Sequence, residues 1–113
     1  MKVKEDVQVV TNSNLKSTIA LAGLYDVVDP EIGLNVVDLG LIYGLYFDDE
    51  QKTVQGTMTL TTQFCPMGES ILNKVTSSLS RSFPQYHVHV ELTFDPPWNA
   101  ERISAGGMEF LNH

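Results

Sequence analysis

The only cysteine of the chain, Cys65, precedes Pro66 and lies between two segments with different hydrophobic periods. Before it, residues 53–61 alternate between the two faces expected of a half-buried strand. After it, apolar residues recur at helical spacing from Met67 to Phe83. We therefore predict that Cys65 stands at a strand-to-helix junction as the helix N-cap, with Pro66 at the first helical position.

A thiol at a helix N-cap has distinctive chemistry. Unpaired backbone N–H groups and the positive end of the helix dipole both favour the thiolate form. Glu69, in the same first turn, opposes this effect, so we predict a reactive but only moderately activated Cys65. The alternative is that Cys65 is a small, buried and inert residue, the usual fate of a free cysteine.

The rest of the chain predicts the elements that position this junction. A helix is expected after a cap at Ser13 or Asn14 and stops at Asp29-Pro30, and an ordered loop follows. The expected elements are a helix over 14–28, a loop over 29–40, a hairpin of strands over 41–48 and from 53, the second helix, a third strand over 87–94 and a short helix over about 100–111.

This order predicts an α+β fold with two layers. A small mixed three-stranded sheet would carry helices on one face, in the order α-β-β-α-β-α. The second helix should connect two parallel strands by a right-handed crossover. Residues 1–13 are expected to form a polar tail or a short edge segment, and residues 14–113 a single domain.

Composition limits the possible partners. The 113 residues with 42% hydrophobic content suit one domain, and a single cysteine excludes an internal disulfide. No apolar run is long enough for a membrane span, and no signal peptide is evident, so a cytoplasmic location is expected. Seven basic against fourteen acidic residues give a net charge of −7, which argues against binding to nucleic acid or to a membrane surface.

Four motifs occur together in a recognisable order. They are Asp29-Pro30-Glu31, the run from Val37 to Tyr43, Thr59 to Thr62 leading to Cys65-Pro66, and Asp95-Pro96-Pro97-Trp98. Over about residues 15–111 the chain resembles the MIP18 family, formerly DUF59. The resemblance implies a fold like that of the iron–sulfur scaffold domains. It also implies a role in iron–sulfur cluster assembly or maturation alongside SUF-type machinery, or as an adaptor for a phenylacetyl-CoA type oxygenase.

The resemblance also assigns residues. It implies that Cys65 is the reactive cysteine and candidate cluster ligand, supported by a set of neighbouring positions. Those supporting residues are Glu31, Asp38, Thr61 and Thr62, with Asp95, Pro97 and Trp98 as a partner surface. The residue types alone also allow plainer structural roles: Asp38 could cap a turn through its side chain, and Trp98 could cover the core.

One thiol limits what the chain can hold. Iron–sulfur clusters usually have four thiolate ligands, so a monomer cannot hold one by thiolates alone. A homodimer would present two thiols, and the incomplete ligand set would make any bound cluster transient. The expected partners are therefore the assembly machinery and apo-client proteins, and no enzymatic activity is expected.

Two other functions stay open. Cys65 could be the nucleophile of an enzyme, with His87 or His89 as base and Asp38 orienting it, but the chain has no phosphate loop, protease signature or Cys-x-x-Cys motif. The same two histidines, two residues apart on a strand, could also ligate a metal, although polar alternation is usual on any solvated sheet face. Alternatively, the chain could be a pure interaction module that docks a partner through its acidic surface and Trp98.

Overall fold

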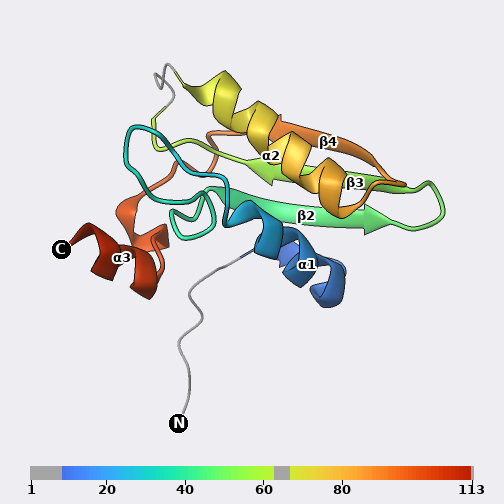
Figure 1. Cartoon of the computed structure of the whole chain (residues 1–113), viewed down its shortest axis with the longest axis horizontal. Helices are drawn as coiled ribbons and strands as arrows, with labels where there is room; N and C mark the ends of the chain where they lie inside the picture. Colours follow the sequence, from blue (N-terminus) through green and yellow to red (C-terminus); the bar gives the residue numbers. More distant parts are fainter. Residues whose placement is uncertain (1–8, 63–66, 113) are drawn as a thin grey trace, which may run out of the picture.

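A four-stranded mixed sheet forms the centre of the computed structural model, which describes residues 9–62 and 67–112 (Figure 1). β1 pairs parallel with β2, β2 antiparallel with β3, and β3 parallel with β4. The predicted hairpin and the predicted parallel pair, which the second helix connects, are both confirmed. In sheet order, the strands are β1 (Val10–Thr11), β2 (Ile42–Asp48), β3 (Thr53–Met58) and β4 (His87–Leu92).

The prediction of three strands was wrong, because β1 lies inside the predicted polar tail. Two residues are too few for a period-two pattern to be visible in the sequence. The side chain of Asn12 extends the pairing: its Nδ2 donates to the carbonyl oxygen of Phe47 at 2.9 Å, and the Phe47 N–H donates to its Oδ1 at 2.9 Å. A side-chain amide thus replaces one more backbone pair at this edge.

Two helices, α1 (Asn14–Leu24) and α2 (Gly68–Ser82), lie on the same face of the sheet (Figure 1). Ser13 caps α1 as predicted, because its Oγ accepts the Lys16 N–H at 3.3 Å. The predicted end of this helix at Val28 was wrong: the helix ends at Leu24, and Val28 instead forms an isolated bridge with Asn35.

The predicted C-terminal helix is divided into two short pieces. A 3-10 turn, η1 (Ala100–Arg102), is followed by α3 (Ala105–Leu111), with Ser104 as the N-cap of α3. This pair lies at the end of the sheet opposite the β2–β3 turn (Figure 1). Among the helices in the described ranges, none is both long and apolar enough to cross a membrane.

The hydrophobic core lies between the sheet and the two larger helices. The alternation predicted for β3 is confirmed, since Val54, Gly56 and Met58 are buried. From α2, the core receives fully buried side chains at helical spacing, namely Ile71, Val75 and Leu79. Within the described ranges, the opposite face of the sheet carries no helix, and β4 exposes polar side chains there, which gives the predicted two-layer α+β architecture.

Asp49, in the turn between β2 and β3, joins three parts of the fold. Its carboxylate accepts a hydrogen bond from the Tyr86 hydroxyl at 2.6 Å and pairs with Lys16 Nζ at 3.1 Å. The hydrogen bond from Tyr86, and then Lys16, lower the pKa of Asp49 below its ordinary value of 3.8. The same hydrogen bond raises the pKa of Tyr86 above 10.0, because the carboxylate favours the protonated phenol.

We expect Tyr86→Phe to raise the pKa of Asp49 towards its ordinary value. Because the folded-state pKa is lowered, the contribution of Asp49 to stability is present above its unfolded pKa and is lost as the pH falls through the folded value. The contribution of Tyr86, whose pKa is raised, is lost as the pH rises above 10.0. Carboxyl NMR titration of Asp49 in both proteins measures the shift, with Tyr46→Phe on the exposed sheet face as control. An unchanged pKa in Tyr86→Phe would contradict this account.

Candidate functional site

The segments that carry the predicted site residues meet at one end of the sheet. Ile42 at the start of β2 pairs with Met58 at the end of β3, and Met58 also pairs with Leu92 at the end of β4. The loop before β2, the connection from β3 to α2 and the turn after β4 therefore all leave the sheet at this end (Figure 1). The topology brings together four motifs that are far apart in the sequence.

Cys65 belongs to the connection from β3 to α2 and lies, with Pro66, outside the described residues. The described part of the connection shows that the predicted N-cap was wrong, because α2 begins at Gly68 and its N-cap is Met67. Gly68 packs closely against Leu60: a β-carbon on Gly68 would lie 2.6 Å from Cδ1 of Leu60, so a larger residue there would displace the Leu60 side chain. The connection from β3 to α2 therefore begins after Leu60 and ends before Gly68, and these two residues contact each other.

Asp38 connects the loop before β2 to the C-terminal segment. Its carboxylate accepts hydrogen bonds from Asn35 Nδ2 at 2.8 Å and from the Ser104 hydroxyl at 2.7 Å. Its backbone carbonyl accepts the Ser104 N–H at 2.8 Å, while its own N–H donates to Asn35 Oδ1 at 2.8 Å. Asp38 therefore joins this turn to the N-cap of α3. The side chain that caps the turn is that of Asn35, so the structure does not support the alternative in which Asp38 caps a turn through its own carboxylate.

The two residues after Asp38 make further contacts with the same segment. Trp98 Nε1 donates to the Leu39 carbonyl at 2.7 Å, and Arg102 Nε donates to the Gly40 carbonyl at 2.7 Å. Arg102 also lies over the ring of Tyr43, 4.3 Å from its centroid. We call this set of contacts between residues 38–40 and 98–104 the C-terminal latch. Trp98 is half-buried against the core, which favours the alternative in which it covers the core.

Glu31 lies at the surface of the first motif, and Asp29 lies inside it. Asp29 is only 2% exposed, and its Oδ1 accepts the Glu31 N–H at 2.9 Å. Its carbonyl accepts the N–H groups of Ile32 and Gly33 at 3.2 and 2.7 Å. Asp29 shapes the turn, and the exposed carboxylate of Glu31 is the one presented to solvent.

The remaining predicted residues differ in exposure. Thr61 is half-buried and Thr62 is exposed where the connection to α2 begins. In the last motif, Asp95 and Pro97 are exposed, and the Tyr43 hydroxyl donates to the intervening Pro96 carbonyl at 2.8 Å. Exposed positions thus flank the connection that carries Cys65 and the turn that carries Trp98.

The histidines of β4 lie away from this end. His87 and His89 are exposed, and His89 Nε2 lies 3.9 Å from a Glu91 carboxylate oxygen. Within residues 9–62 and 67–112, no group of three or more His, Cys, Asp or Glu side chains is placed to hold a metal ion.

Residues 19–94 match the model of a family described as iron–sulfur cluster assembly protein. This match covers more than half of the chain, so the chain belongs to that family. The family match includes the connection that carries Cys65 and three of the four motifs in full, and it confirms the resemblance drawn from them.

Named relatives agree with the family. The chain is 36% identical over 90 residues to the Fe-S protein maturation auxiliary factor YitW of Bacillus subtilis, covering 80% of this chain and 86% of the relative. It is 37% identical over 78 residues to the Fe-S protein maturation auxiliary factor SufT of Staphylococcus aureus, covering 69% and 88%. A crystal structure of a DUF59 domain from Bacillus anthracis superposes with a TM-score of 0.78 at 34% identity, covering 86% of this chain and 91% of that one.

Sequence reasoning missed two residues that organise the site. Asp29 was interpreted only as part of a helix stop, although an Asp before a turn also predicts the Asx turn that it forms. Arg102 had no local signal, because its contacts with Gly40 and Tyr43 join residues about sixty positions apart.

Proposed function

We propose that this protein is a cytoplasmic, non-enzymatic iron–sulfur protein maturation factor that acts through Cys65. It would carry a transient cluster as cargo or bring the assembly machinery to an apo-client. One observation supports this most: the four family motifs meet at the sheet end from which the Cys65 connection leaves. The names of the relatives, which are maturation auxiliary factors, point the same way.

The chemistry of a single thiol fits a carrier better than a storage site. A cluster usually takes four thiolate ligands, and this chain supplies one. A second copy of the chain, a small thiol or the client must then complete the ligand set. An incomplete set binds the cluster weakly, so exchange onto a client with four cysteines is favourable.

The surrounding residues would have supporting roles. In this proposal the exposed carboxylate of Glu31 and the Thr61-Thr62 segment line the approach to Cys65, and Asp38 holds the loop beside them. Asp95 and Pro97 would offer the partner surface, with Trp98 fixing the turn that carries them.

Anaerobic reconstitution with ferrous iron and sulfide tests the proposal. The wild type should develop visible absorbance and bound iron, and it should pass the cluster to an apo-ferredoxin. Cys65→Ser should lose the chromophore and the transfer while unfolding in urea at the same midpoint. Glu31→Gln, at an exposed position of the same motif, should keep the chromophore and show whether the carboxylate alters the transfer rate.

Two results would change the conclusion. If neither folded protein takes up iron, cluster carriage is wrong, and an adaptor role remains to be measured as client activity in cells that lack the wild-type protein. If Cys65→Ser restores full client activity in those cells, the dependence on the thiol is wrong, and the pure interaction module is the better description.

A further inference from the structure

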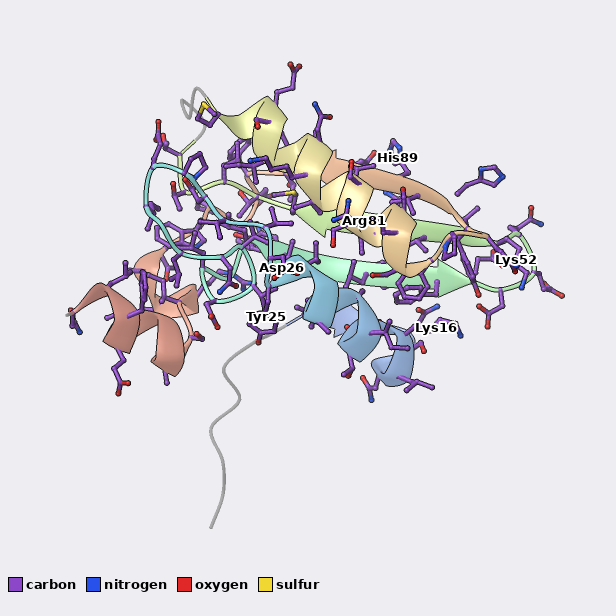
Figure 2. All side chains as sticks on the ribbon, viewed as in Figure 1. Lys16, Tyr25, Asp26, Lys52, Arg81 and His89 are labelled. Carbon is purple, nitrogen blue, oxygen red and sulfur yellow. The ribbon has the colours of Figure 1, made fainter. Side chains whose placement is uncertain are left out.

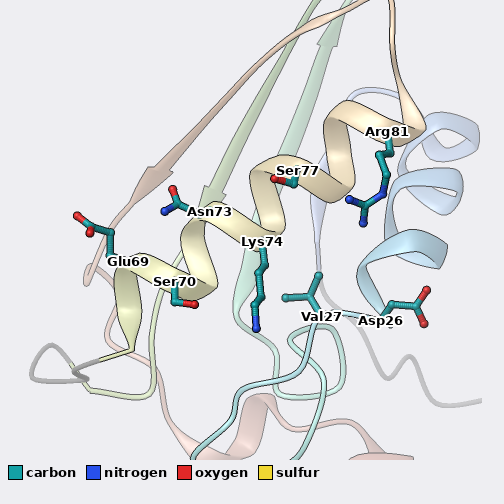
Figure 3. Close-up of a pocket in the computed structure, with 8 residues that line it drawn as sticks. All are labelled: Asp26, Val27, Glu69, Ser70, Asn73, Lys74, Ser77 and Arg81. Atoms are coloured by element: carbon teal, nitrogen blue, oxygen red, sulfur yellow. The ribbon is translucent and has the colours of Figure 1, made fainter.

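A polar groove runs between the exposed side of α2 and the segment that follows α1. It has a volume of about 590 Å³, and Asp26 and Val27 form the wall opposite α2. From α2, the side chains of Lys74 and Arg81 extend into the space between the two walls (Figure 3). The hydroxyl residues Ser70 and Ser77 line the groove on the same helix.

Lys74 and Arg81 differ from the other lysines and arginine of the described ranges because neither has an ionic or aromatic partner there. Lys16 pairs with Asp49, Lys52 lies 5.3 Å from the ring centroid of Tyr86, and Arg102 stacks on Tyr43. Figure 2 places Lys16 and Lys52 towards the β2–β3 turn, whereas Arg81 lies beside the groove. In a chain with a net charge of −7, two unpaired cations in one groove form a local positive site.

Two carboxylates also border the groove, so its lining carries as many negative as positive charges, but these carboxylates do not pair with the two cations. Glu69 and Asp26 lie at its two ends, and their carboxylate groups point away from Lys74 (Figure 3). Neither carboxylate lies within ion-pair distance of Lys74 or Arg81 in the described structure. The middle of the groove therefore offers two positive charges and hydroxyl groups.

We propose that this groove docks an acidic segment of a partner protein in an extended conformation. Lys74 and Arg81 are seven residues apart on α2, which is about 10 Å along a helix axis. In an extended segment of polyproline II type, which has three residues per turn, side chains three residues apart lie on the same side and are separated by about 9 Å. Two carboxylates with that spacing can pair with both cations, while Ser70 and Ser77 bond to the backbone of the segment.

The groove suits a segment better than a single small anion because its two cations are two helical turns apart. Ser70 lies in the first turn of α2, so a docked segment would run towards the connection that carries Cys65. The inference does not depend on cluster binding, since its test measures peptide binding and leaves iron and sulfide out.

An NMR titration of the full, ¹⁵N-labelled protein tests the docking. The probe is a ten-residue Gly/Ser peptide with two aspartates three positions apart, compared with the same peptide carrying asparagines. We expect the aspartate peptide to shift amide signals of residues 26–27 and 69–81. The Lys74→Gln, Arg81→Gln double variant should bind about tenfold more weakly, since each exposed ion pair contributes up to about 1 kcal/mol. Lys52→Gln, which removes a cation elsewhere, is the matched control.

Several outcomes would overturn the proposal. They are equal binding of the asparagine peptide, shifts that map outside the groove, or equal weakening by Lys52→Gln. Inorganic phosphate that produces the same shifts at the same concentration would show a simple anion site instead of a peptide groove. The double variant must keep the dispersed spectrum of the wild type, and Lys74→Gln and Arg81→Gln measured singly separate the two contributions.

Discussion

Gly40→Ala is expected to lower the free energy of unfolding by about 2 to 5 kcal/mol. Gly40 has φ +75°, a left-handed conformation that costs a residue with a β-carbon about 1 to 2 kcal/mol. A β-carbon there would also overlap the carbonyl oxygen of Arg102 and lie 2.7 Å from its Cβ. Displacing packed neighbours costs about 1 to 3 kcal/mol more. Urea denaturation followed by circular dichroism measures the loss.

Gly33→Ala is the matched control for this substitution. Gly33 has a similar φ of +84°, but a β-carbon there meets no heavy atom within 4 Å. The Gly33→Ala variant should therefore lose only the stability that the left-handed backbone conformation costs a residue with a β-carbon, about 1 to 2 kcal/mol. The difference between the two variants isolates the contact between Gly40 and Arg102 in the C-terminal latch. Equal losses would mean that this close contact contributes nothing to stability.

Leu79→Ala should destabilise the protein by about 2 to 5 kcal/mol, the usual cost of emptying a buried leucine site. Leu79 lies in the last turns of α2, is fully buried and belongs to the main core. The missing side chain leaves a cavity that the sheet beneath it can only partly fill. Urea unfolding midpoints of the variant and the wild type test this directly.

Leu15→Ala provides the comparison at an exposed helical site. Leu15 is on α1 and is 74% exposed, so its truncation should change stability by no more than about 0.5 kcal/mol. If both variants lose the same stability, the burial assigned to α2 is wrong. If only Leu79→Ala is destabilised, the core position of α2 is supported.

Elements with a sustained hydrophobic period were predictable from the sequence. β3 alternates over its whole length, and α2 carries a regular apolar stripe, so both were found with small errors at their ends. The end of α1 at Leu24 could not be predicted from the sequence. Val28 pairs with Asn35 instead of continuing the helix, and Asn35 lies outside the helical pattern of apolar residues. β1 was missed because two residues carry no period.

The candidate site was predictable as a set of motifs but not as a geometry. The family motifs located Asp38 and Trp98, whereas their hydrogen bonds to Ser104 and Leu39 join positions 66 and 59 residues apart. Local patterns cannot show such contacts. The N-cap prediction placed the start of α2 too early, since the helix begins at Gly68 with Met67 as its N-cap.

The contact between Leu60 and Gly68 also bears on how such a protein can evolve. Because the connection begins and ends at touching residues, changing its sequence or length adds little closure cost, which grows only slowly with loop length. The length of this connection can then change between family members while the sheet and helices keep their packing. Adaptation of the connection and maintenance of the scaffold become nearly separate problems for selection.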